Sequence, residues 1–169
     1  MKKIFLFLMP VLFFACKKES TPYSNEFTKS QQAWEAYKAT VNNSYSYIAY
    51  SASVFGAYSE TTITVRNGKV TGRSFIQGMY RQGSTTLQIV NSWTEDNTTL
   101  NTHTNGATAL TLDEIYAKAP KEWLSVDTKQ NEVIFTTDPN GFIASCGYIP
   151  NGCMDDCFRG IYIKSITHL

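Results

Sequence analysis

The sequence predicts an α+β fold, in which an antiparallel β-sheet has two helices packed on one face. Two observations predict this fold class. Apolar residues recur at helical spacing before Asn42 and again after Thr111, and alternating strand-type stretches follow each helical stretch. Helices that are separated from runs of strands are typical of α+β proteins. The order of elements also suggests a duplicated α-β-β-β module, although the two halves share no sequence repeat.

The composition is that of a folded protein with little net charge. The chain has 169 residues, with 15 Lys and Arg against 14 Asp and Glu, and aromatic residues make up 14%. Intrinsic disorder requires few aromatic residues and a high net charge, so this composition excludes it. A nucleic-acid-binding protein would carry a basic excess, as would a polybasic membrane contact, so neither is expected.

The first helix is predicted over residues 30–41. Trp34, Tyr37 and Val41 recur at spacings that place them on one helix face. Ser30 is the expected N-cap, because its hydroxyl can accept a hydrogen bond from an unpaired backbone N–H of the first turn. The Asn pair at 42–43 is the expected end of the helix.

A β-hairpin is the clearest local prediction. A strand over 45–50 precedes it, and Asn67-Gly68 then separates two alternating runs. Asn-Gly is the preferred two-residue hairpin turn, because both positions need a positive φ. The implied register pairs Arg66 with Lys69, Val65 with Val70, and Thr64 with Thr71. Another strand is expected around Leu87, Ile89 and Trp93, before a long polar connection over 96–109.

The second half repeats the helix-then-strands order. Thr111 and Glu114 have the spacing of a capping box, and Pro120 is expected to limit the helix that they begin. Strands are predicted over 132–137, 142–148 and 157–166. The turn at 138–141, Asp-Pro-Asn-Gly, joins the first two, because Pro presets φ and Gly accepts the left-handed position.

The N-terminus is typical of an exported protein. Residues 1–15 combine two Lys with an uncharged run from Ile4, which at helical rise spans about 18 Å and is too short for a ~30 Å hydrocarbon core. This pattern predicts a signal peptide rather than a membrane span. The end of the run, Phe-Phe-Ala before Cys16, resembles the lipobox of bacterial lipoproteins, although Phe13 stands where Leu is usual. An ordinary secretory peptide is the alternative interpretation.

The lipobox resemblance implies a lipid anchor on Cys16. It implies cleavage before Cys16, acylation of that residue, and attachment to the bacterial outer membrane on its periplasmic or cell-surface side. Two or three acyl chains hold a protein far more firmly than the marginal binding of one chain. The sequence then predicts a lipidated Cys and polar tether over 16–29, followed by a single α+β domain over 30–169.

Short matching segments are spread through most of the domain. They are Trp34, 45–47, 65–70, 111–116, 133–135, 138–143 and 155–156. In these positions the chain resembles a family of small bacterial secreted proteins and lipoproteins known only as a domain of unknown function. The resemblance covers nearly all of residues 31–166. It implies the fold and the compartment, and it implies no catalytic residue.

Three cysteines remain after Cys16, and an exported protein meets an oxidising compartment. Cys153 and Cys157 are closest in sequence, and closing their five-residue loop would stabilise the fold by roughly 2 kcal/mol. Pairing of Cys146 with either of them is the alternative. A structural zinc site normally takes four Cys or His ligands, and the two His residues are not placed to complete one.

No pattern in the chain indicates catalysis or a cofactor. Nucleophile-elbow, zincin, Walker A and dinucleotide-binding motifs are all missing from the sequence. Asp155 and Asp156 offer hard oxygens for Ca²⁺, but such a pair more often forms a solvated turn. We therefore expect a non-enzymatic binding or structural module with an envelope protein or a glycan as partner. An inhibitor of a secreted enzyme and, after it, a small hydrolase with two carboxylates are the alternatives.

Overall fold

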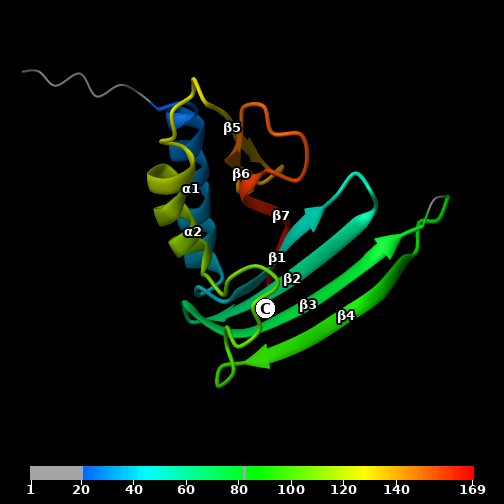
Figure 1. Cartoon of the computed structure of the whole chain (residues 1–169). Coiled ribbons are helices and arrows are strands. Elements are labelled where there is room, and N and C mark those ends of the chain that lie inside the picture. Colours follow the sequence, from blue (N-terminus) through cyan, green and yellow to red (C-terminus); the bar gives the residue numbers. More distant parts are fainter. Residues whose placement is uncertain (1–20, 82) are drawn as a thin grey trace, which may run out of the picture.

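A single antiparallel sheet of seven strands, with two helices beside it, forms the fold (Figure 1). This computed structural model describes residues 21–81 and 83–169. The helices are α1 (Ser24–Thr40) and α2 (Leu112–Lys118), and a π-helical turn, η1 (Ala119–Trp123), follows α2. The strands are β1 (Tyr45–Ala52), β2 (Ala57–Arg66), β3 (Lys69–Tyr80), β4 (Leu87–Asp96), β5 (Asn131–Thr137), β6 (Ile143–Pro150) and β7 (Arg159–His168). The predicted α+β class is therefore confirmed.

The strand order brings the two halves of the chain together at the centre of the sheet. The order is β4-β3-β2-β1-β7-β6-β5, so β1 pairs with the last strand, β7, as well as with its neighbour β2. In Figure 1 the strands β2, β3 and β4 extend well beyond the helices, while β5 and β6 lie close to them. The end of the sheet that carries β4 is thus the less covered one.

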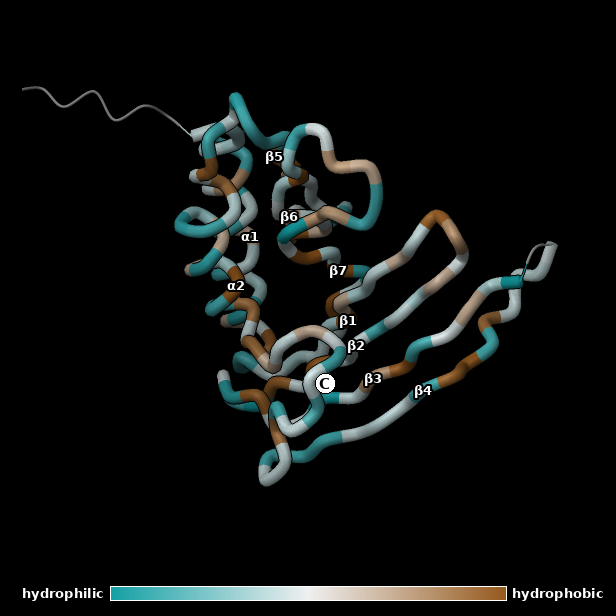
Figure 2. Tube along the Cα trace, viewed as in Figure 1, coloured by the Kyte–Doolittle hydropathy of each residue, from teal (hydrophilic) through white to brown (hydrophobic). Residues whose placement is uncertain are grey.

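The core lies between the helices and the central strands. Trp34 of α1 has no exposed surface, and its ring meets Tyr45 of β1 edge-on with 4.8 Å between the ring centroids. Its indole N–H donates to Asp113 of α2 over 2.7 Å, which ties the two helices to each other. The tube in Figure 2 shows apolar residues spaced along both helices, as an amphipathic helix requires.

The first helix begins at Ser24 and not at Ser30, so residues 24–29 belong to the helix rather than to the predicted tether. The cause is Phe27, which is buried against Tyr116 and Phe135 and extends the apolar face of the helix by about two turns. Ser30 consequently lies inside the helix. Its hydroxyl is buried and lies 2.8 Å from the Tyr116 hydroxyl, so it is not an N-cap.

The Asn-Gly hairpin is confirmed, with one correction to its register. Arg66 pairs with Lys69 and Val65 with Val70, as predicted. Beyond them, however, Thr64 pairs with Gly72 rather than Thr71, because β3 contains one extra residue at a β-bulge. A bulge increases the local twist of a strand pair, and two-residue alternation carries no signal for it.

The second half matches its predicted elements with small shifts at the boundaries. Thr111 forms the predicted capping box with Glu114, and Gly141 takes a φ of 86° in the predicted turn. The α-helical part of α2 ends before Pro120, but the chain does not leave the helix there, since η1 continues to Trp123. The last strand begins at Arg159, two residues later than predicted.

Candidate functional site

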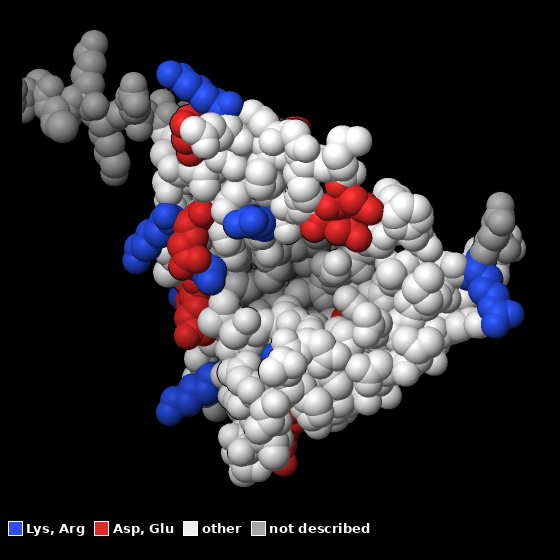
Figure 3. All heavy atoms as spheres, in the orientation of Figure 1, with Lys and Arg blue, Asp and Glu red and all other residues white. Residues whose placement is uncertain are grey.

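A groove of about 510 Å³ opens on the sheet and is the candidate binding site. Its floor comes from β1, β2 and β7, and two loops form its walls. Figure 3 shows the hollow near the centre of the molecule. The floor is lined mainly by small side chains, among them Ala49, Ser51, Ser59 and Thr61. Because these side chains are short, the surface of the sheet is recessed here between the two flanking loops.

The first wall is the connection between β4 and α2, which folds back over the sheet. Its Gly106 and Ala107 face the groove. The Ala107 N–H donates to the Thr61 hydroxyl over 2.9 Å. Gly106 has a φ of 86°, and a Cβ added there would lie only 2.9 Å from Thr61 Oγ1 and from a ring carbon of Phe75. A glycine is therefore needed for the loop to approach the strands so closely.

A buried ion pair holds this loop in place. Arg73 of β3 donates to both carboxylate oxygens of Glu95 on β4, each over 2.8 Å, and the two side chains are 3% and 0% exposed. The same guanidinium also donates to the carbonyl oxygens of His103 and Ala107 in the loop. A bidentate Arg–carboxylate pair fixes geometry more tightly than a single contact, so the pair connects the sheet to the wall of the groove.

Glu95 also binds the loop directly. Its carboxylate accepts hydrogen bonds from the backbone N–H groups of Asn101 and His103, and the His103 ring nitrogen Nδ1 lies 2.9 Å from it. The Arg73 guanidinium, together with these His103 and Asn101 contacts, holds the pKa of the Glu95 carboxyl well below its usual range. Glu95 is therefore a carboxylate at every pH at which the protein would normally function.

Aromatic stacking completes the attachment of the loop. The His103 ring stacks on Trp93 with 4.4 Å between the centroids, and Trp93 in turn stacks on Phe75. The Trp93 indole N–H donates to Asn105 over 3.0 Å, and Arg73 lies over the same indole ring. These cation–π and stacking contacts hold the loop on the sheet in addition to the ion pair.

The second wall is the connection between β6 and β7. Cys153 and Cys157 are joined by a disulfide in this loop. Asp156, Cys157 and Phe158 face the groove, and the Phe158 ring stacks on Tyr162 with 4.0 Å between the centroids. A short disulfide loop and a stacked ring limit the number of conformations available to this wall. Both walls are thus fixed by cross-links to the sheet or within the loop.

The lining of the groove carries little charge. Among the described residues that line it, Asp156 is the one carboxylate, and Lys, Arg and His are not represented. Tyr162 also lines the groove, and burial together with the neighbouring Tyr50 raises the pKa of its hydroxyl. The Ser and Thr hydroxyls, the tyrosines and Asp156 offer hydrogen bonds to a neutral or cationic ligand.

The candidate site residues predicted from the sequence lie in different parts of the chain. Cys16, the predicted site of lipidation, lies outside the described residues. Cys146 is a free thiol, buried in β6, and burial raises the pKa of that thiol to about 12. Asp155 and Asp156 are exposed on the second wall. Within residues 21–81 and 83–169 there is no group of three or more His, Cys, Asp or Glu side chains that could hold a metal ion.

The ion pair between Arg73 and Glu95 was not predicted from the sequence. A signal for it does exist, because Arg73 alternates with the apolar Phe75, and Glu95 alternates with Trp93, on the face of each strand that points inward. A charged residue at an inward position of a strand requires a partner. Only the β3–β4 register, which pairs Arg73 with Glu95, shows that each residue is the partner of the other.

Comparisons with known proteins add no relative. No protein family, no curated protein and no solved structure matches the chain. The resemblance to an uncharacterised family of secreted proteins and lipoproteins stays a prediction. Among the helices that the structure describes, none is both long and apolar enough to span a bilayer.

Proposed function

We propose that the chain is a lipid-anchored protein of the bacterial outer membrane, which acts as a non-enzymatic binding module through the groove. The sequence up to Cys16 supports the anchor, since a short uncharged run ends there in a small residue and a cysteine. The observation that carries the binding function is the groove of about 510 Å³, whose walls are cross-linked and rise from a sheet of paired strands. Pre-formed concave sites of this size are typical of ligand-binding proteins.

The proposed ligand is a neutral or cationic part of an envelope protein or glycan. The groove offers hydroxyl groups from Ser51 and Ser59 and a single carboxylate from Asp156. It also presents the aromatic side chains of Phe158 and Tyr162 at one side. Hydroxyls beside aromatic rings suit sugar rings and peptide groups, which need both hydrogen bonds and apolar contact.

The binding proposal is tested by filling the groove. The variant Ser59→Trp places a large side chain on the floor, and Thr128→Trp places one at an exposed position between η1 and β5, outside the groove. Both variants and the wild type would be immobilised and exposed to solubilised envelope proteins and to soluble peptidoglycan fragments. We expect a ligand retained by the wild type and by Thr128→Trp to be lost from Ser59→Trp. Equal retention by all three would contradict binding in the groove.

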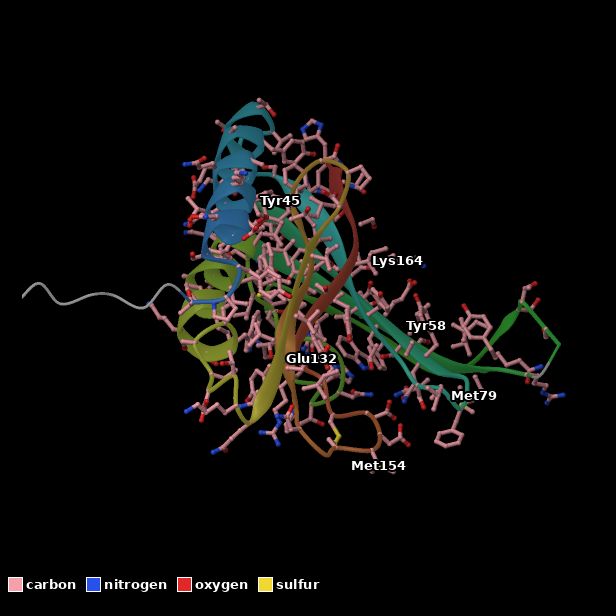
Figure 4. The ribbon with its side chains drawn as sticks, turned by 90° about the horizontal axis from the view of Figure 1, so that it is seen from above. Tyr45, Tyr58, Met79, Glu132, Met154 and Lys164 are labelled. Carbon is pink, nitrogen blue, oxygen red and sulfur yellow. A yellow bond between two sulfur atoms is a disulfide. The ribbon has the colours of Figure 1, made fainter. Side chains whose placement is uncertain are left out.

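Inhibition of a secreted enzyme is the second candidate. One observation favours it, because Met154 is 96% exposed on the disulfide-bonded loop and is free to enter the active site of another protein. Figure 4 shows Met154 at the outer edge of the molecule. A panel of periplasmic and secreted hydrolases assayed with the wild type and with Met154→Ser would test this function. Inhibition that Met154→Ser removes would favour it over the groove.

For the architecture, we infer that α1 and α2 together cover one face of the sheet. The support is that both helices contribute to the same buried cluster as β1, β2 and β6. A duplicated α-β-β-β module fits this arrangement poorly. The successive strands of each half, β1 to β3 and β5 to β7, are placed one after another toward the β4 edge of the sheet. The first strands of the two halves, β1 and β5, nevertheless point in opposite directions. No rotation superposes such halves while keeping their helices on one face.

A further inference from the structure

The end of the sheet away from the helices carries exposed apolar side chains on the turn between β1 and β2 and on the adjoining ends of β3 and β4. Val54 and Phe55, in the turn between β1 and β2, are 88% and 74% exposed. Near the turn between β3 and β4, Ile89 and Val90 are 57% and 71% exposed. We call this surface the distal tip and define it as residues 53–56 with Met79, Tyr80, Ile89 and Val90. Isolated exposed apolar residues are normal, but a group of them indicates a contact surface.

Backbone pairing makes the distal tip one connected surface. The Tyr80 N–H donates to the carbonyl oxygen of Gly56 over 2.9 Å, so the first turn rests on the end of β3. Gly56 has a φ of 88°, and a Cβ there would lie 2.7 Å from the Tyr80 carbonyl oxygen. On the other side of β3, Gly78 pairs with Ile89. Figure 2 shows apolar residues both on the first turn and along β4.

The distal tip lies in a part of the molecule with almost no charge. Residues 47–59 contain no charged side chain, and residues 74–94 contain only Arg81. In Figure 3 the right-hand end of the molecule, where β3 and β4 end, shows one basic side chain and no acidic one. Removing this tip from water would therefore dehydrate no carboxylate, whereas the one Arg could meet an anionic group.

We propose that the distal tip inserts into the headgroup region of a phospholipid bilayer. Val54 and Phe55 then enter the acyl boundary, Tyr80 lies at headgroup level, and Arg81 faces lipid phosphate. Tyrosine suits this interface because its ring is apolar and its hydroxyl is polar. The proposal rests on the anchor at Cys16, which would bring the chain to a membrane. Since α1 begins at Ser24 and the distal tip lies at the other end of the molecule (Figure 1), two contacts would lay the molecule along the bilayer.

A bilayer fits this tip better than a second copy of the chain does. The exposed side chains sit on a projecting turn and on the neighbouring strand ends, and a bilayer accepts them without a matching cavity. Pairing of two β4 edges is hindered, because Gln77 pairs with Asn91 and Gly78 with Ile89, which leaves Val90 as an extra residue in a bulge. Bulges on edge strands are a common obstacle to edge-to-edge association.

The test uses a chain of residues 21–169, which keeps every described helix and strand and the whole described core but lacks Cys16. It would be mixed with vesicles of phosphatidylethanolamine and phosphatidylglycerol and separated by flotation. We expect the wild type to bind. The double variant Val54→Ser with Phe55→Ser should bind at least about 100-fold more weakly, since full burial of each side chain contributes about tenfold or more.

Leu169→Ser is the matched control, because Leu169 is an exposed apolar residue next to His168, which pairs with Tyr45 at the other end of β1. It should bind like the wild type, and circular dichroism should show that all the variants are folded. Absence of wild-type binding, or equal binding by the double variant, would overturn the proposal. The proposal would also be overturned if the wild type formed concentration-dependent dimers without binding vesicles and the double variant did not form these dimers. Because this chain lacks Cys16, failure here would leave the proposed anchor untouched.

Discussion

Arg73 and Glu95 face each other across β3 and β4, and their side chains form a bidentate ion pair that also binds the loop above them. The pair therefore has two roles in the structure. It satisfies two charges that lie beneath the surface, and it fixes the loop that forms one wall of the groove. Loss of one partner should affect both the stability of the domain and the shape of the groove.

The first prediction concerns removal of one partner. Arg73→Met leaves the Glu95 carboxylate buried without its main counter-charge, and breaking a buried pair in this way is strongly destabilising. We expect the midpoint of thermal unfolding to fall by roughly 10 °C. The double variant Arg73→Met with Glu95→Leu should recover part of this loss, because no charge is then left buried. Equal midpoints for the single variant and the wild type would contradict the assigned role.

The second prediction concerns the loop itself. In the same double variant, the backbone N–H groups of Asn101 and His103 lose the carboxylate that accepts their hydrogen bonds. Amide hydrogen exchange over residues 97–110 should therefore be faster than in the wild type even where overall stability recovers. Exchange over β1 and β2 should change only as much as the overall stability does and is the internal control. Unchanged exchange in the loop would show that other contacts hold it.

The third prediction is a pH dependence. The folded pKa of Glu95 is lowered by Arg73, below the unfolded value of about 4.3. Its contribution to stability is therefore complete above roughly pH 5 and is lost as the pH falls through the folded pKa. Denaturant unfolding measured from pH 7 down to pH 3 should show a steeper loss of stability for the wild type than for the Arg73→Met, Glu95→Leu variant. Parallel curves would contradict the lowered pKa.

The fourth prediction concerns the contact between the helices. Trp34→Phe removes the indole N–H that donates to Asp113 and leaves space in the core, so we expect a loss of about 2 kcal/mol of unfolding free energy. Trp123→Phe is the control, since Trp123 is half-buried and lies beside Lys118. It should cost less than about 1 kcal/mol. A larger effect for Trp123 than for Trp34 would be inconsistent with the described core.

The hairpin shows how far the sequence reaches. Asn67-Gly68 predicts the turn and its first two residue pairs, because the turn type dictates them. It does not predict that Thr64 pairs with Gly72, since a bulge depends on the twist of the whole sheet. Similarly, Ser30 has the residue type of an N-cap. Its true role, a buried contact with Tyr116, depends on packing between segments 86 residues apart in sequence.

The groove could be predicted only in part. The second wall follows from two cysteines in an exported chain, which favour the pairing of Cys153 with Cys157 that the structure contains. The first wall does not follow, because the polar connection after Asp96 carries no periodicity that would place it on the sheet. Its position depends on one long-range pair, Arg73 with Glu95, and on the close approach that Gly106 permits.

The most direct test of the central claim is mass spectrometry of the N-terminal peptide of the protein purified from bacterial membranes. We expect a peptide that begins at Cys16 and carries the added mass of a diacylglyceryl group and an amide-linked acyl chain. The N-terminal peptide of the variant Cys16→Ser should lack this added mass. A Cys16 without added mass would contradict the lipid anchor, whether the chain is uncleaved or is cleaved at another position.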